Sequence, residues 1–269
     1  MSRARSATTG ALALLSALVL AACGTQQAAQ ADQGSTPAAA DPGAVVLTAA
    51  TTTAKSGTAA VDMKAVMSLG GVDQTMTATG KTALDGSKAD LTMTLPGVGG
   101  AGVSMHELVV GSHVYVQITG MPGLPKGWLT MPDSALQSLG LSGPASGTSA
   151  TDVLSVLRSL GTVTEVGPEQ VNGVATTHFH GEVSPSAILG KVGASAPAAL
   201  KDALGSDPVP IEVYVDGAQH VVRVSEKLTV TVSGKKVAES VQVDFSDFGV
   251  PFTVSAPAHA RSFASALGG

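Results

Sequence analysis

The stretch that decides the fold is IEVYVDGAQHVVRVSEKLTVTVSGKKVAESVQVDF, residues 211–245. Apolar and polar side chains alternate along it with a period of two, which is typical of strands that bury one face of a sheet. Asp216-Gly217 and Gly234 provide turn residues between the runs, so the stretch predicts successive antiparallel strands. The apolar side of the last two strands is predicted to carry Val222, Val224, Leu228, Val230 and Val232, then Val237, Val241, Val243 and Phe245.

A second run of alternating residues covers positions 58–119. Gly70-Gly71, Asp85-Gly86 and Gly111-Ser112 interrupt it, and Asp-Gly is a strong hairpin signal. Short connections join antiparallel neighbours, so about five antiparallel strands are expected here. Their apolar side is predicted to carry Val61, Met63, Ala65, Met67 and Leu69, then Met76, Ala78, Thr82 and Leu84, then Leu91, Met93 and Leu95, then Val103, Met105 and Val109, and finally Val114, Val116 and Ile118.

The rest of the body predicts three more strands and several helices. The first helix begins at Asp41-Pro42, where Asp41 can cap and Pro42 suits the first helical position. We expect an α+β fold, with a single large curled antiparallel sheet (a half-open β-barrel of about 10–11 strands) covered by helices on its concave face. The additional strands are predicted at 162–166, 174–183 and 250–255, and the helices at 42–54, 134–141, 151–160, 185–191 and 197–204.

The N-terminus has the features of an export signal. Arg3 and Arg5 precede an apolar run at 11–20, and small residues lead to Cys23 in the order Leu20-Ala21-Ala22-Cys23. This order resembles the bacterial lipobox, which implies a diacylglyceryl group on the Cys23 sulfur, cleavage before Cys23 and often a further acyl chain such as palmitate on the new amino terminus. The alternatives are an ordinary secreted protein with an unrelated cysteine, and a spanning helix, for which the run is shorter than the ~20 residues required.

Composition limits what the exported body can be. Residues 24–43 are rich in Ala, Gln, Ser, Thr, Pro and Gly, so they are expected to form a flexible tether with a mean reach of about 25 Å. Cys23 is the chain's single cysteine, and the formal charge is −5, which leaves no disulfide and gives no indication of nucleic-acid binding. The chain is thus divided into a signal peptide at 1–22, a lipidated cysteine and tether at 23–43, a folded domain at 44–257 and a loose tail at 258–269.

Three local patterns resemble one family of envelope lipoproteins. They are Val213-Tyr-Val-Asp-Gly217 followed by Val221-Val-Arg-Val224, Trp128 after a strand and a Pro/Gly loop, and Asp244-Phe-Ser-Asp-Phe-Gly-Val-Pro-Phe-Thr-Val-Ser-Ala-Pro257. Together with the lipobox and the order of elements, they resemble the LppX/LprA/LprF/LprG family over about 44–257, and more distantly the LolA/LolB carriers. The resemblance implies a half-open β-barrel over an apolar cavity that holds lipid acyl chains. Aromatic residues make up only 3% of this chain, which leaves the lining and the ligand open.

The methionines are the strongest local indication of a binding surface. Methionine is flexible and polarizable, and it suits adaptable apolar surfaces as well as ordinary cores. Trp128 is a candidate for the mouth of the cavity, with plain packing as the alternative. The candidate cavity lining comprises Met63, Met67, Met76, Met93, Met105, Val116, Ile118, Val222, Val224, Leu228, Val230, Val241 and Val243.

Motifs for catalysis and metal binding are lacking in the sequence. It contains no Gly-x-Ser-x-Gly, His-Glu-x-x-His or Gly-x-x-x-x-Gly-Lys-Ser/Thr pattern. His178, His180 and Glu182 share one face of a predicted strand, which favours solvated side chains over a metal site. Asp244 and Asp247 are expected to be solvated or to cap a turn. We expect no catalytic residue, no metal and no cofactor.

These observations favour a non-enzymatic lipoprotein on the outer face of the cell membrane. It would bind the acyl chains of a lipid or an acylated glycolipid for carriage or presentation, with an envelope lipid-export partner and without nucleic acid. The first alternative is a non-catalytic interaction or scaffold lipoprotein with a filled core. A hydrolase with an unrecognised Ser/His/Asp triad is the third.

Overall fold

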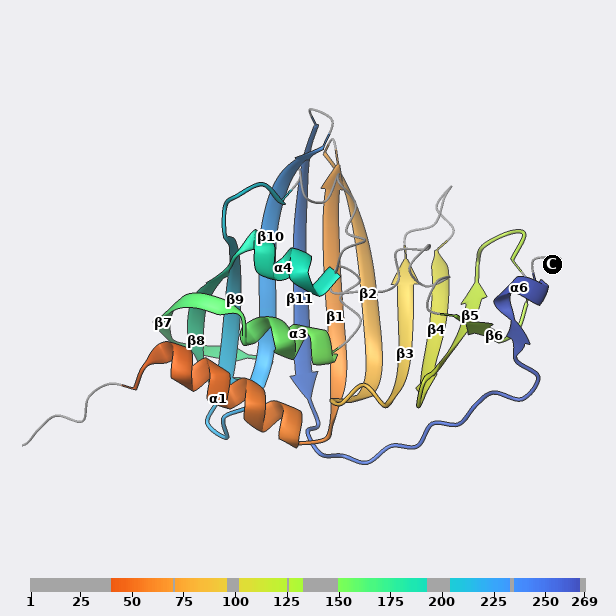
Figure 1. Ribbon diagram of the computed structural model, residues 1–269, viewed down its shortest axis with the longest axis horizontal. Helices are drawn as coiled ribbons and strands as arrows, with labels where there is room; N and C mark the ends of the chain where they lie inside the picture. Colours follow the sequence, from red (N-terminus) through yellow and green to blue (C-terminus); the bar gives the residue numbers. More distant parts are fainter. Residues whose placement is uncertain are drawn as a thin grey trace, which may run out of the picture. The chain divides into compact units, whose positions relative to one another are not determined.

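The residues that the structure describes form one open sheet of twelve strands, in the order β12-β6-β5-β4-β3-β2-β1-β11-β10-β9-β8-β7 (Figure 1). The computed structural model describes residues 40–69, 71–95, 102–124, 126–132, 150–192, 204–232 and 235–266, all within the compact unit Ala40–Gly269. The strands are β1 Thr58–Leu69, β2 Val72–Ala83, β3 Lys88–Leu95, β4 Val103–Val110, β5 His113–Thr119, β6 Leu129–Met131, β7 Leu160–Val171, β8 Val174–Val183, β9 Val209–Asp216, β10 Val221–Val232, β11 Lys235–Ser246 and β12 Arg261–Ser262. The helices are α1 Pro42–Lys55, α3 Ala150–Leu157, α4 Pro185–Val192 and α6 Phe263–Ala266.

The alternating stretches form the strands that the sequence predicts. Residues 211–245 contain β9, β10 and β11, which are antiparallel neighbours, and residues 58–119 contain β1 to β5 in antiparallel succession. Strand β1 pairs with β2 on one side and with β11 on the other, so that Met63 lies opposite both Ala78 and Val243. The two halves of the sheet therefore share one continuous apolar face.

The sheet differs from the expected curled, fully antiparallel half-barrel. It is neither closed nor strongly curled, and β12 pairs in parallel with β6. The expected strand at 250–255 is wrong because this segment makes no ladder; Pro251 lacks a backbone N–H that a ladder would need. It is held instead by Thr58, which donates to the Val250 carbonyl at 3.0 Å, and by Lys88, whose Nζ donates to the Phe252 carbonyl at 3.0 Å.

Two short strands were absent from the expected set. Strand β6 has 3 residues and β12 has 2, which is too few for a period of two to be recognised. The segment between β11 and β12 passes to the β6 edge of the sheet (Figure 1). The tail expected to be loose therefore contains β12 and α6, and Phe263 of α6 packs against the core.

Helix α1 packs against the sheet as its sequence predicts. The Asp41 carboxylate accepts a hydrogen bond from the Gly43 N–H at 3.3 Å, and Pro42 occupies the first turn. The helix buries Val46, Ala49, Ala50 and Thr53 and contacts α3, β7, β9 and β10. A helix whose threonines make it weak in isolation is thus stabilised by packing.

The other helices match the expected positions in part. Helix α3 covers most of the expected 151–160 segment, and α4 the expected 185–191 segment. The helices expected at 134–141 and 197–204 lie outside the described residues, apart from Leu204. Within the described ranges, no helix has the length and apolar character needed to cross a membrane.

Candidate functional site

The apolar face of the sheet collects most of the candidate lining residues. Methionines from three different strands are almost fully buried on it: Met63 is 1% exposed, Met93 1% and Met105 2%. Cross-strand pairing explains this arrangement, because Ala78 opposes Met93 and Met93 opposes Met105. The other buried members of the candidate set are Val116, Val222, Val224 and Val243.

Towards the β1–β2 turn, the same face becomes open. Met67 is 46% exposed, and the register places it beside Glu239, which opposes Leu228 on β10. A second row joins Ala65, Val241 and Glu226 across the same three strands. Met76, Ile118, Leu228 and Val241 are half-buried, and the Val230 side chain lies outside the described part. The apolar face thus continues from a closed part into an exposed part. We call the exposed part, made of the rows Met67–Glu239–Leu228 and Ala65–Val241–Glu226, the open apolar strip.

A β-bulge changes which β10 residue joins the core. The register shifts between Val221 and Arg223, and Val221 is fully buried in the core cluster, whereas Val222 is buried outside it. Strict alternation, counted back from Val224, predicted that Val222 and not Val221 would join the core. Beside the bulge, the Val221 N–H donates to Thr53 Oγ1 of α1 at 2.8 Å.

Three glutamates lie on the apolar face and were missing from the candidate set. Glu107 opposes Leu91 and Val116, while Glu226 and Glu239 lie in the two rows of the open apolar strip. Burial raises the pKa of all three carboxyls, and the charge of Glu239 raises the pKa of Glu226 further. If the period of two is applied to every position of a strand, including the polar residues, it predicts that these three glutamates lie on the apolar face.

Trp128 does not lie where a cavity mouth on the apolar face requires it. Its ring lies 5.0 Å from the ring of His106, measured between centroids. His106 neighbours Met105 on β4 and so faces the opposite side of the sheet, where its Nε2 lies 2.7 Å from Asp90 Oδ1. The contact agrees with the packing alternative for Trp128.

The polar face carries an ion pair at the centre of the sheet. Arg223 donates from Nε to Asp244 Oδ1 and from Nη2 to Asp244 Oδ2, both at 2.6 Å, and Asn172 Nδ2 donates to Oδ2 at 2.9 Å. These bonds to Asp244 raise the pKa of Arg223. Asp244 is therefore a partner in a bidentate ion pair. The sequence had predicted a solvated or turn-capping residue at this position, and that prediction is wrong.

The two histidines of β8 share one carboxylate. His178 Nε2 lies 2.7 Å from Glu212 Oε2, and His180 Nδ1 lies 2.9 Å from Glu212 Oε1. Burial alone would raise the pKa of Glu212, but the hydrogen bonds and charges of His180 and His178 outweigh it and lower the pKa. Tyr214 stacks on His178 with 4.4 Å between ring centroids. Glu182 lies opposite Pro210, and the described residues contain no His/Cys/Asp/Glu group arranged to hold a metal.

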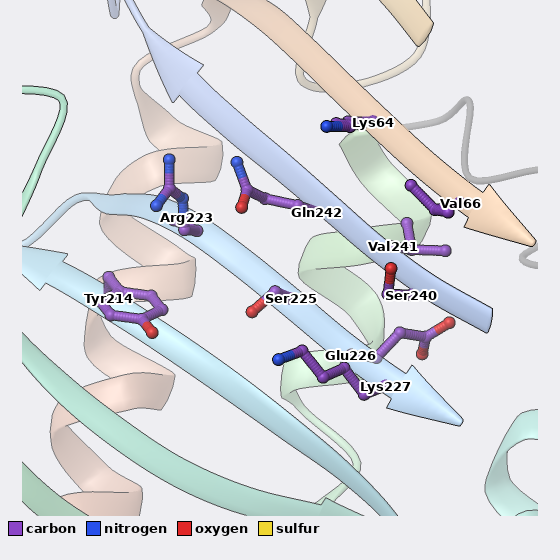
Figure 2. A pocket seen from close by; sticks show the side chains of 10 residues that line it. All are labelled: Lys64, Val66, Tyr214, Arg223, Ser225, Glu226, Lys227, Ser240, Val241 and Gln242. Carbon is purple, nitrogen blue, oxygen red and sulfur yellow. The ribbon is translucent and has the colours of Figure 1, made fainter. Parts of the chain in front are cut away.

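A hollow of about 320 Å³ lies beside this polar network. Figure 2 shows the residues that line it, with Lys64 on β1, Gln242 on β11, Arg223 and Lys227 on β10 and Tyr214 on β9. Ser225, Ser240, Val66, Glu226 and Val241 complete the lining. The sequence pattern gave no indication of this hollow, because it depends on which strands become neighbours.

Comparison with known proteins gives structural similarity without sequence relatives. No protein-family model matches the sequence, and no curated protein matches it significantly. The lipoprotein LppX of Mycobacterium tuberculosis is 16% identical, with 80% of this chain and 100% of that chain covered and a TM-score of 0.49. LprF of Mycobacterium bovis is 13% identical over 80% and 96%, with a TM-score of 0.49. A LolA superfamily protein of Nitrosomonas europaea is 9% identical over 80% and 96%, with a TM-score of 0.29. In structure, the chain is similar to LppX and LprF.

Proposed function

We propose that this protein is a membrane-anchored lipoprotein of the cell envelope that binds the acyl chains of a lipid or lipoglycan on the apolar face of its sheet, for carriage or presentation. The observation that supports this most is the open apolar strip. There, an exposed Met67 continues the line of the buried Met63 on β1. Exposed apolar surface that is continuous with a core is typical of binding surfaces.

The physical requirement for such a protein is large. An acyl chain in water costs about 0.8 kcal/mol per methylene, so a sixteen-carbon chain costs on the order of 12 kcal/mol. Val, Leu and Met side chains can remove an acyl chain from water without covalent chemistry, and flexible methionines adapt to acyl chains of different length. The proposed function therefore needs no catalytic residue.

The proposed anchor places this surface near its ligand. Acylation of Cys23 would hold the protein on the outer face of the cell membrane, and residues 24–43 would allow a mean reach of about 25 Å. Holding the folded domain close to the bilayer raises the effective concentration of lipid at the open apolar strip.

A fluorescent acyl probe tests this function. We expect the full chain carrying Cys23→Ser to bind the probe saturably, and Met67→Asp on that background to weaken binding at least about fivefold, because a carboxylate replaces apolar contact. Thr229→Asp is the matched control, since Thr229 is exposed on the opposite face of β10. Absence of saturable binding, or equal losses in the two variants, would contradict the proposal.

The alternative is a non-catalytic interaction lipoprotein with a filled core. Its support comes from Val72, which is 64% exposed next to the β1–β2 turn and could contact a protein partner together with Met67. Lipid content separates the two functions, because an interaction lipoprotein would be purified without lipid and would not take up the acyl probe.

A further inference from the structure

The hollow on the polar face is formed by the pairing of four strands. Lys64 opposes Gln242, and Gln242 opposes Ser225 on β10. Ser225 and Ser240 are short, whereas Lys64, Arg223, Lys227 and Tyr214 around them are long (Figure 2). Short side chains in the middle of long ones leave the space of about 320 Å³, which is within the size range of small-molecule sites.

Two cations of this hollow are not neutralised. Arg223 is held by Asp244 at 2.6 Å, whereas Lys64 and Lys227 are exposed and form no ion pair with any residue that the structure describes. They stand two strands apart, on the order of 10 Å at the backbone, so their flexible stems allow both ammonium groups to reach one anion. Glu226, the one carboxylate in the described lining, belongs by register to the apolar face.

Neutral hydrogen-bonding groups line the hollow: Ser240 and Gln242 lie on β11 between the strands of the two lysines, Ser225 lies on β10, and Tyr214 lies on β9 beyond them. The hydroxyls of Ser225, Ser240 and Tyr214 line the hollow, and they can each donate and accept. Gln242 gives its amide N–H to Asp244 at 3.3 Å, which leaves its carbonyl oxygen directed elsewhere as an acceptor. Tyr214 is held in place by its stacking on His178.

We propose that this hollow is a second binding site, specific for a phosphorylated polyol such as an inositol phosphate or glycerol phosphate. The phosphate is bound between Lys64 and Lys227, and the polyol hydroxyls bond to Ser225, Tyr214 and the Gln242 carbonyl. The residues proposed to bind the ligand lie by register on the face opposite the open apolar strip, whereas Glu226 and Val241 of that strip border the hollow; phosphate binding does not require an acyl chain. The ligand is either a free polyol phosphate or the headgroup of a phosphoinositide-type lipid at the membrane surface.

A calorimetric titration of the full chain carrying Cys23→Ser with inositol 1-phosphate tests the site. We expect saturable binding that weakens about tenfold in Lys64→Gln and in Lys227→Gln, because each substitution removes a charge-assisted hydrogen bond. Ser225→Leu keeps both charges but fills the hollow, and it should abolish binding. Lys81→Gln is the matched control: Lys81 is an exposed lysine on the same face of the sheet, outside the hollow.

Several results would overturn the site. They are the absence of saturable binding, an equal loss in Lys81→Gln, unchanged binding in Ser225→Leu, or binding of uncharged inositol with the same affinity. Circular dichroism of each variant checks that the fold is kept.

Phosphatidylcholine vesicles with and without phosphatidylinositol distinguish the source of the ligand. Binding only to the vesicles that contain phosphatidylinositol, competed by inositol 1-phosphate, identifies a headgroup site. Binding of the soluble phosphate alone identifies a free polyol phosphate. Vesicle binding that both lysine variants retain also overturns the site.

Discussion

Thr53 is the residue through which helix α1 is fastened to the sheet. Its Oγ1 is fully buried, donates to the Ala49 carbonyl at 2.8 Å and accepts the Val221 N–H of the bulge at 2.8 Å. Thr53→Val keeps the shape but leaves the buried Val221 N–H without a partner. We expect the free energy of unfolding to fall by about 1–3 kcal/mol, measured by urea denaturation. Thr51→Val is the control, since Thr51 bonds only within the helix, to the Leu47 carbonyl; an equal loss there would argue against this role.

Glu226 makes stability depend on pH in a defined direction. Its folded pKa is raised above the ordinary value of 4.5 by burial and by Glu239, so the folded state binds the proton more readily than the unfolded state. The free energy of unfolding should therefore fall as pH rises from about 4.5 through the raised folded pKa. Glu226→Gln should flatten this dependence and stabilise the protein at neutral pH, as measured by urea denaturation across pH.

Glu212→Gln is expected to change the free energy of unfolding in the opposite direction to Glu226→Gln. The lowered pKa of Glu212 means that its contribution is present above the ordinary value of 4.5 and is lost as pH falls through the lower folded pKa. Glu212→Gln should therefore destabilise the protein at neutral pH. Parallel shifts in the two variants would show that burial and histidine pairing do not control these carboxylates.

At the level of elements, strands with long alternation were predictable and irregular segments were not. Residues 211–245 predicted β9, β10 and β11 because the alternation is long and the turns are marked. The bulge between Val221 and Arg223 lies beside the contact with α1, and the alternation of the strand does not mark it. The residues 250–255 alternate as a strand does, yet Pro251 limits their ladder, and β6 was too short to show a period.

Gly80 tests the pairing of β2 with β3. Its φ is +154°, and an added Cβ would overlap the carbonyl oxygen of Asp90 on β3. We expect Gly80→Ala to lower the free energy of unfolding by about 1–3 kcal/mol, because both backbone strain and the overlap must be relieved. Gly161→Ala is the control, since its Cβ would have ordinary contacts and its φ is not positive. Equal thermal denaturation midpoints in the two variants would contradict this pairing geometry.

For the whole molecule, the pairing of β1 with β11 decides how the candidate surfaces are built. It joins the methionines of the first sheet half to the valines of the second in one apolar face, and Met63 opposite Val243 is the central contact. The sequence predicts the two faces separately, because the period of two is local. The open apolar strip and the hollow beside Lys64 both arise at this junction, so neither could be predicted from one strand alone.

Native mass spectrometry of the full chain carrying Cys23→Ser, purified from cells that make it, tests acyl-chain binding most directly. We expect a population with the mass of the protein plus a lipid, and loss of this population in Met67→Asp but not in Thr229→Asp. A single mass equal to the protein alone, unchanged after incubation with acyl lipids, would contradict the proposal that the apolar face of this sheet binds lipid.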